Sequence, residues 1–137
     1  MGLAEHSEGA QASQYLQQAV DAYHNALQVR TREQLPQDWA ATQNNLGNAL
    51  RDLAERSEGA QASQYLQQAF DAFHSALNVY SESGFPAQWT QITRTLANAY
   101  EIEKDWDHAL ECYEQLLSHE RTNLDLQAKV KELSGKR

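Results

Sequence analysis

A stretch of seventeen residues returns almost unchanged fifty positions later, and this repeat constrains the fold more than any other feature of the chain. Residues 3–19 read LAEHSEGAQASQYLQQA, and residues 53–69 differ from them only in having Arg56 in place of His6. Weaker matches continue at the same offset, including the pairs Pro36/Pro86 and Trp39/Trp89. A fixed period of about 20–50 residues is typical of stacked supersecondary units with a continuous core. We therefore expect a repeat architecture.

Composition and periodicity both favour helices. Ala, Gln and Leu dominate, and only two prolines and six glycines interrupt the 137 residues, so most positions lose little side-chain freedom in a helix. Apolar residues recur at spacings of three and four. They predict helices over residues 8–30, about 37–56, 60–80, 87–103, 106–118 and about 123–133, with TREQLPQD and SESGFPAQ as the long connections. The last helix should carry a narrow apolar stripe of Leu126, Val130 and Leu133.

The net charge and the cysteine count exclude several classes of function. A charge of −8, from 19 acidic and 11 basic residues, argues against nucleic acid and against an anionic membrane surface as partners. No run approaches the roughly 18 apolar residues that a membrane-spanning helix needs, and the first residues do not resemble a signal peptide. The single cysteine, Cys112, excludes an intrachain disulfide. We therefore expect a cytoplasmic protein with no membrane span.

Small and large residues alternate at fixed places in two neighbouring helices. NNLGNAL at 44–50 places Leu46-Gly47 in a first helix, and QQAFDAFHSAL at 67–77 supplies the second. This pattern resembles the tetratricopeptide repeat, a family of helix pairs. The family's remaining positions are Ala69, Phe73 and Ala76 in this unit, and Leu96-Ala97, Tyr100, Ala109, Tyr113 and Leu116 in the last unit. Gly47 in mid-helix costs about 1 kcal/mol relative to alanine. We therefore expect another helix to approach closely there.

The resemblance implies an all-α fold, a short right-handed α-solenoid of antiparallel helix pairs with about six helices. The family's unit of about 34 residues is here extended to a 50-residue period. One domain over residues 1–137 then divides into a half repeat (1–35), a long complete repeat (36–85), a complete repeat with a short turn (86–120), and a capping helix with its tail (121–137). In this alignment residues 3–19 contain the end of a first helix, a turn and the beginning of a second helix.

The first helices of such a solenoid line a concave groove that often binds peptides. By family alignment the groove positions are Asn44, Asn48 and Arg51 in one unit and Arg94, Asn98 and Glu101 in the next. Asparagine can hydrogen-bond an extended peptide backbone, and arginine can pair with a carboxylate. The alternative is that these residues are only the solvated polar surface of their helices. The lysines of the family's carboxylate clamp are absent.

The N-terminal edge is a second candidate surface. The helix over 8–30 should pack on a preceding helix, of which only GLAEH remains, so Leu16, Ala19, Val20 and Tyr23 should stay partly exposed. Such an apolar edge marks an interaction site. We expect self-association through it, most simply as a two-fold homodimer. A related possibility is that the turn Ser57-Glu58-Gly59 straightens and exchanges units between chains.

Metal-binding and catalytic interpretations are weaker. Asp21 with His24, and Asp71 with His74, place a carboxylate and an imidazole one turn apart. Two such pairs could hold a metal, but exposed polar pairs of this spacing are also common on helices. Cys112 lies on an apolar stripe, where a thiol is more often a core residue than a nucleophile. We predict no catalytic residue, no metal site and no cofactor.

These observations favour a non-enzymatic protein-interaction module. It would bind a peptide or protein through the concave face, or associate with itself through the N-terminal edge. The alternative is a structural or assembly unit without a separate ligand, such as a homo-oligomer, a domain-swapped dimer, or a piece or engineered derivative of a longer repeat array.

Overall fold

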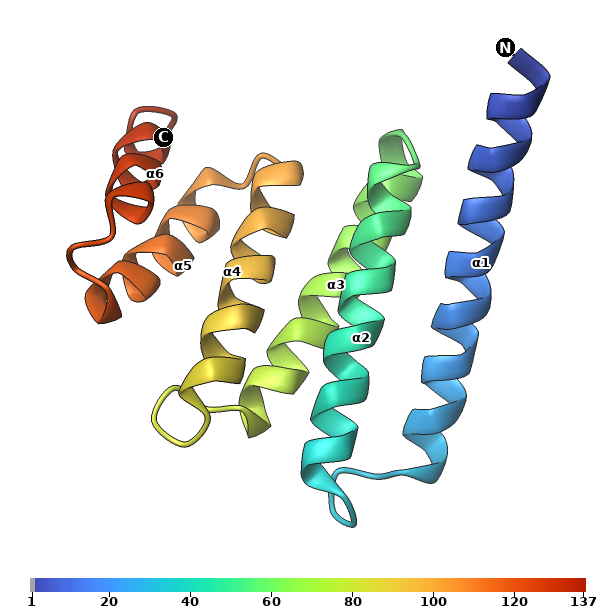
Figure 1. Cartoon of the computed structure of the whole chain (residues 1–137), viewed down its shortest axis with the longest axis horizontal. Helices are drawn as coiled ribbons and strands as arrows, with labels where there is room; N and C mark the ends of the chain where they lie inside the picture. The colour runs from blue at the N-terminus through green and yellow to red at the C-terminus, as the bar shows by residue number, and fades with distance from the viewer. Residues whose placement is uncertain (1) are drawn as a thin grey trace. The chain divides into compact units, whose positions relative to one another are not determined.

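The structure is a computed structural model that describes the backbone of residues 2–137 and the side chains of residues 9–137. This part of the chain forms six α-helices and no strand (Figure 1). The helices are α1 (Gly2–Val29), α2 (Pro36–Glu55), α3 (Gly59–Val79), α4 (Pro86–Ile102), α5 (Trp106–His119) and α6 (Leu124–Ser134). The prediction of an all-α chain is therefore confirmed, and every helix end except one lies within one residue of the predicted position.

The exception is the start of α1. The helix begins at Gly2 instead of residue 8 and passes through residues 7–9 without a break, so the turn predicted in the first copy is wrong. In the second copy Ser57-Glu58 does separate α2 from α3, with Ser57 Oγ donating to the Leu53 carbonyl at 2.8 Å and Gly59 adopting a φ of +59°. That turn lets α3 pack back on α2. α1 packs against α2, and its Gln17 side chain donates a hydrogen bond to the Tyr65 hydroxyl of α3. This arrangement requires no reversal of the chain at residues 7–9, and the sequence stays helical.

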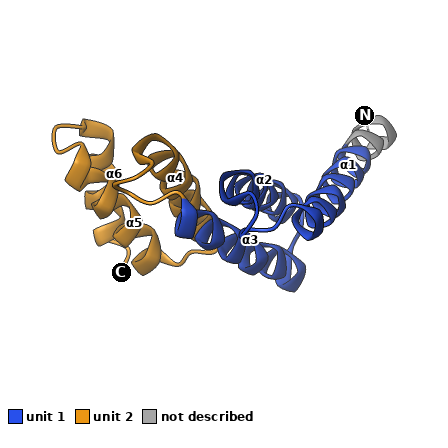
Figure 2. Ribbon diagram, turned by 90° about the horizontal axis from the view of Figure 1, so that it is seen from below, with its two compact units in different colours: residues 1–79 blue, residues 80–137 orange. Residues whose placement is uncertain are grey.

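The helices form two compact units, residues 1–79 and residues 80–137 (Figure 2). In the first unit α2 packs against both α1 and α3. In the second unit α5 packs against both α4 and α6. Each unit therefore has one central helix with a neighbour on each side.

The core of the first unit lies between α2 and α3 and depends on one glycine. Leu50, Leu53 and Phe73 are at most 2% exposed. A Cβ atom added at Gly47 would lie 2.6 Å from the Phe73 ring, so the two helices approach this closely because residue 47 has no side chain. The prediction of a close helix approach at Gly47 is confirmed. The packed aromatic ring offsets the weak helix propensity of glycine.

The fifty-residue period is also present in the backbone of the two long connections. The N–H of Leu35 donates to the Thr31 carbonyl, and the N–H of Phe85 donates to the Ser81 carbonyl, both at 2.9 Å. Leu35 and Phe85 share a φ of −137°, with ψ of 72° and 66°. The proline that follows each residue begins a helix, where a missing N–H removes no intrahelical bond. Both predicted connections are confirmed.

Capping side chains begin the last two helices. Asp105 and Asn123 each accept a hydrogen bond from the backbone N–H three residues later, at 3.3 and 3.1 Å. Such caps satisfy donors that a helix start leaves free. Leu126 and Leu133 of α6 are buried, and Val130 is partly exposed. The predicted apolar stripe of the last helix is therefore confirmed.

Candidate functional site

One face of α1 carries apolar side chains that no helix in the described part of the chain covers. Tyr15 is 60% exposed and Ala22 is exposed, whereas Leu16, Ala19, Tyr23 and Ala26 are partly exposed. At about 100° per residue these positions fall on one side of the helix. We call this set the uncovered face; its members are Tyr15, Leu16, Ala19, Ala22, Tyr23 and Ala26.

The helix α3 shows how the same residues behave when a helix covers them. It repeats the sequence of α1 fifty positions later and packs against α2. Five of its equivalent side chains are at most 3% exposed: Leu66, Ala69, Ala72, Phe73 and Ala76. Because the two sequences are so similar, the difference in burial comes from the covering helix. The uncovered face is therefore a packing surface that lacks its helix in this structure.

The predicted N-terminal edge agrees with this face at three positions out of four. Leu16, Ala19 and Tyr23 are partly exposed, as expected. Val20 is only 7% exposed, so the expectation that it stays uncovered is wrong. The reason is that Val20 lies at the border of the uncovered face, beyond Leu16, on the side of α1 that packs against α2. Its counterpart Phe70 is buried to the same extent.

The first half of the predicted peptide groove lies on α2. Asn44, Asn48 and Arg51 are all partly exposed, and they occupy successive turns of the helix. Arg51 forms an ion pair with the adjacent Asp52, at 3.2 Å between Nη2 and Oδ1. Of these three residues, Asn44 and Asn48 offer amides that could hydrogen-bond a peptide backbone.

The second half of the predicted groove lies on α4, in the other compact unit. Arg94 is exposed, with Nη2 3.9 Å from the Glu120 carboxylate, and Asn98 is partly exposed. The Glu101 side chain is only 17% exposed. The Glu101 carboxylate is thus less accessible to a peptide than the Arg94 guanidinium.

The carboxylate of Glu101 instead connects the three helices of the second unit. It accepts a hydrogen bond from the Tyr113 hydroxyl of α5 at 2.6 Å and one from Lys129 Nζ of α6 at 2.9 Å. Burial, and then the hydrogen bond to Glu101, raises the pKa of Tyr113 well above its usual range. The same carboxylate raises the pKa of Lys129. Sequence reasoning missed this network because its members lie 12 and 28 positions apart.

We expect Glu101→Ala to destabilise the chain by about 2 kcal/mol, because it leaves the buried Tyr113 hydroxyl without an acceptor. Urea denaturation measures the change. Glu114→Ala, at an exposed position of α5, is the control and should change stability little. Equal stabilities of the two variants would show that the network contributes nothing.

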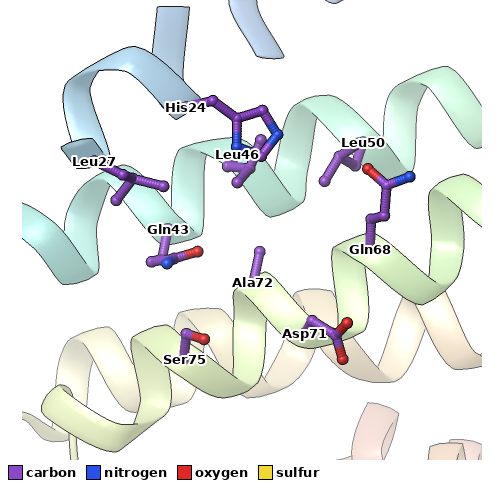
Figure 3. Close-up of a pocket in the computed structure, with 9 residues that line it drawn as sticks. All are labelled: His24, Leu27, Gln43, Leu46, Leu50, Gln68, Asp71, Ala72 and Ser75. Carbon is purple, nitrogen blue, oxygen red and sulfur yellow. The ribbon is translucent and has the colours of Figure 1, made fainter. Parts of the chain in front are cut away.

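A hollow of about 280 Å³ lies between α1, α2 and α3 (Figure 3). Its lining includes His24 of α1 and Asp71 of α3, one residue from each predicted Asp-x-x-His pair, beside Leu46 and Leu50 of α2. One carboxylate and one imidazole are too few ligands for a stable metal site. Among the described residues no group of three His, Cys, Asp or Glu side chains is placed to hold a metal ion. The hollow therefore gives the metal hypothesis no support.

Cys112 is a free thiol in the core of the second unit, 8% exposed. Burial, and then the negative charges of Glu111 and Asp105, raises its pKa to about 12. The thiolate is the reactive form of cysteine. The position is that of a core residue and not of an activated nucleophile.

We expect Cys112 to react at pH 8 at least about 100-fold more slowly with a thiol reagent in the folded chain than in denaturant, because the thiolate is scarce and the sulfur is buried. Absorbance after addition of an aromatic disulfide follows the reaction. Equal rates in the two states would contradict the burial of this thiol.

The connection that precedes α4 contacts the end of α5, and no sequence pattern indicated this contact either. His119 Nε2 lies in hydrogen-bond contact with the Glu82 carboxylate, and its ring lies 4.9 Å from the Trp89 ring. Trp89, near the start of α4, is buried and packs there against the end of α5.

Comparison with known proteins does not identify a family for this chain. No protein-family model matches the chain, and no curated protein has a significantly similar sequence. No described helix combines the length and apolar character that crossing a membrane requires.

Proposed function

We propose that this chain is a non-enzymatic protein-interaction module, related in plan to the tetratricopeptide repeat, and that the uncovered face of α1 is its main binding surface. The observation that carries the proposal is the comparison of α1 with α3. Leu16, Ala19 and Tyr23 remain partly exposed, whereas Leu66, Ala69 and Phe73 are fully buried.

Three features support the family resemblance within this proposal. The helices α2 and α3 form a pair joined by a short turn, as do α4 and α5. Gly47 of the first pair lies against the Phe73 ring. Ala97, at the equivalent position of α4, is 0% exposed.

Burial of apolar side chains would supply the binding energy. Removing apolar surface from water stabilises a complex by about 25 cal/mol per Å². The uncovered face offers a leucine and two tyrosines, and aromatic side chains often dominate interfaces. The alanines between them let a second helix approach closely. A helix from another chain is therefore the occupant that this surface fits best.

Without another partner, we propose that two chains pair through this face as a two-fold dimer. Sedimentation equilibrium from low to high micromolar concentration measures the association. Ala22→Glu should give monomers, because it puts a charge on the face at an exposed position where the fold tolerates it. Gln14→Glu adds the same charge at an exposed position outside the face and should leave the dimer intact. A monomer at every concentration would contradict self-association.

Peptide binding by the polar residues of α2 and α4 is the second candidate. It is favoured by Asn44 and Asn48, whose partly exposed amides lie one turn apart on α2. A peptide held there should bind more weakly to Asn48→Ala and equally well to Ala22→Glu. The opposite pattern would assign the peptide to the uncovered face.

The free thiol of Cys112 bears on the cellular compartment. A single buried cysteine, kept free, suits a reducing environment. We propose the cytoplasm.

A further inference from the structure

The part of the chain that the structure describes contains two nearly identical faces but only one helix that covers them. The face of α3 is covered by α2, whereas the same face of α1 is not. A second copy of the chain cannot supply the missing helix, because its own α2 is already packed between α1 and α3. Each additional copy brings one α2 and two such faces. Exchange of α2 between copies therefore always leaves one face per chain uncovered.

The contact between α2 and α3 defines what the missing helix must look like. At Gly47 the Phe73 ring occupies the space where a side chain would begin, with three ring carbons 2.6–2.9 Å from the position of a Cβ atom. Tyr23 is the counterpart of Phe73 on α1. A helix that covers α1 in the same way needs glycine, or at most a very small residue, opposite Tyr23. Larger side chains there collide with the ring.

Apolar residues on either side of the glycine complete the pattern. In α2 the buried residues around Gly47 are Leu46, Ala49, Leu50 and Leu53. Tyr23 differs from Phe73 by a hydroxyl group, which must reach water or a hydrogen-bond acceptor once the ring is covered. The side chains of Gln11 and Gln18, next to the uncovered face, are exposed and uncharged. Selection of a partner thus depends on shape more than on charge.

We propose that the uncovered face of α1 is an acceptor for an amphipathic helix of a different protein, one that carries a leucine-glycine pair followed by apolar residues at the spacing of α2. This inference rests on the proposed function and names the kind of partner that the surface takes. None of the six members of the uncovered face is a glycine, so pairing of two such faces does not reproduce the Gly47–Phe73 contact, and we expect the acceptor to bind such a helix in preference to a second copy.

The α2 sequence itself is the probe. A fluorescent peptide of residues 36–56 is titrated with the full chain and followed by fluorescence anisotropy. We expect saturable binding, and at least about tenfold weaker binding when the peptide carries Gly47→Leu. Leucine favours the helix more than glycine does. A weaker complex therefore reports the collision with Tyr23 and not a loss of helix in the peptide.

Variants of the chain show whether the peptide binds at the uncovered face. Ala22→Glu should abolish binding of the peptide, and Gln14→Glu should not change it. Binding that survives Ala22→Glu would mean that the peptide replaces the internal α2 on α3, which overturns the proposal. The absence of binding, or equal binding of the two peptides, also overturns it. If the chain dimerises through the uncovered face while the peptide fails to bind, the proposed function stands and only this inference fails.

Discussion

Phe73→Ala should destabilise the chain by about 3–5 kcal/mol, the range for removing a buried aromatic side chain from a well-packed core. Phe73 is 0% exposed and fills the space above Gly47. Tyr23→Ala removes the equivalent ring from α1, where it is partly exposed. We expect the second variant to cost only about 1 kcal/mol, because much of the ring surface already contacts water.

Urea denaturation followed by circular dichroism gives both values. The two positions lie in repeated sequence, so the difference between them reports the covering helix and not the local residues. A cost for Tyr23→Ala as large as that for Phe73→Ala would mean that α1 is covered in solution. In that case dilution of the protein should lower the cost if the cover is a second copy.

Gly47→Leu should destabilise the chain by about 3 kcal/mol or more, since the new side chain has to displace a buried ring. The nearest ring atom lies 2.6 Å from the position that a Cβ atom of residue 47 would take. The ring cannot move aside without displacing other core side chains, because Phe73 is fully buried. Loss of packing should therefore exceed the gain in helix propensity of about 1 kcal/mol.

Two comparisons isolate the collision. Gly9 of α1 has no atom within 4 Å of an added Cβ, so Gly9→Ala should leave stability unchanged or raise it slightly. In a Phe73→Ala background, Gly47→Leu should cost much less, because the ring is gone. Additive costs in the double variant would show that Gly47 and Phe73 do not interact.

The helices could be predicted from sequence because their signals are local. Apolar spacing gave the six elements, and the prolines at positions 36 and 86 marked the starts of α2 and α4. The mid-helix Gly47 predicted a close contact, and the family resemblance paired it with Phe73 of the second helix. The structure places the Phe73 ring against Gly47.

The break in the second copy and its absence in the first could not be predicted from sequence, because the two stretches are nearly the same. Ser57-Glu58 forms a turn where α3 packs back on α2, and residues 7–8 continue a helix. Tertiary contacts decide between two conformations that the local sequence allows. A repeat alignment carries the conformation of one copy to the other and fails at this point.

In the candidate site, too, tertiary contacts decided what the local sequence could not. The apolar stripe of α1 was evident from sequence, but the division into a side on α2, with Val20, and an uncovered side was not. Glu101 occupies a groove position in the family alignment, yet its carboxylate binds Tyr113 and Lys129. These partners lie on two other helices, and no local pattern indicates them.

The central claim is that α1 presents, without a cover, the surface that α3 buries. Its most direct test compares Ala19→Cys with Ala69→Cys, each in a Cys112→Ala background, because the residues around both positions are nearly identical. Ala19 is partly exposed and Ala69 is 0% exposed. At low protein concentration the cysteine at position 19 should react with a thiol reagent at least about 100-fold faster than the one at position 69, which reacts only after local opening. Equal rates at the two positions would contradict the claim.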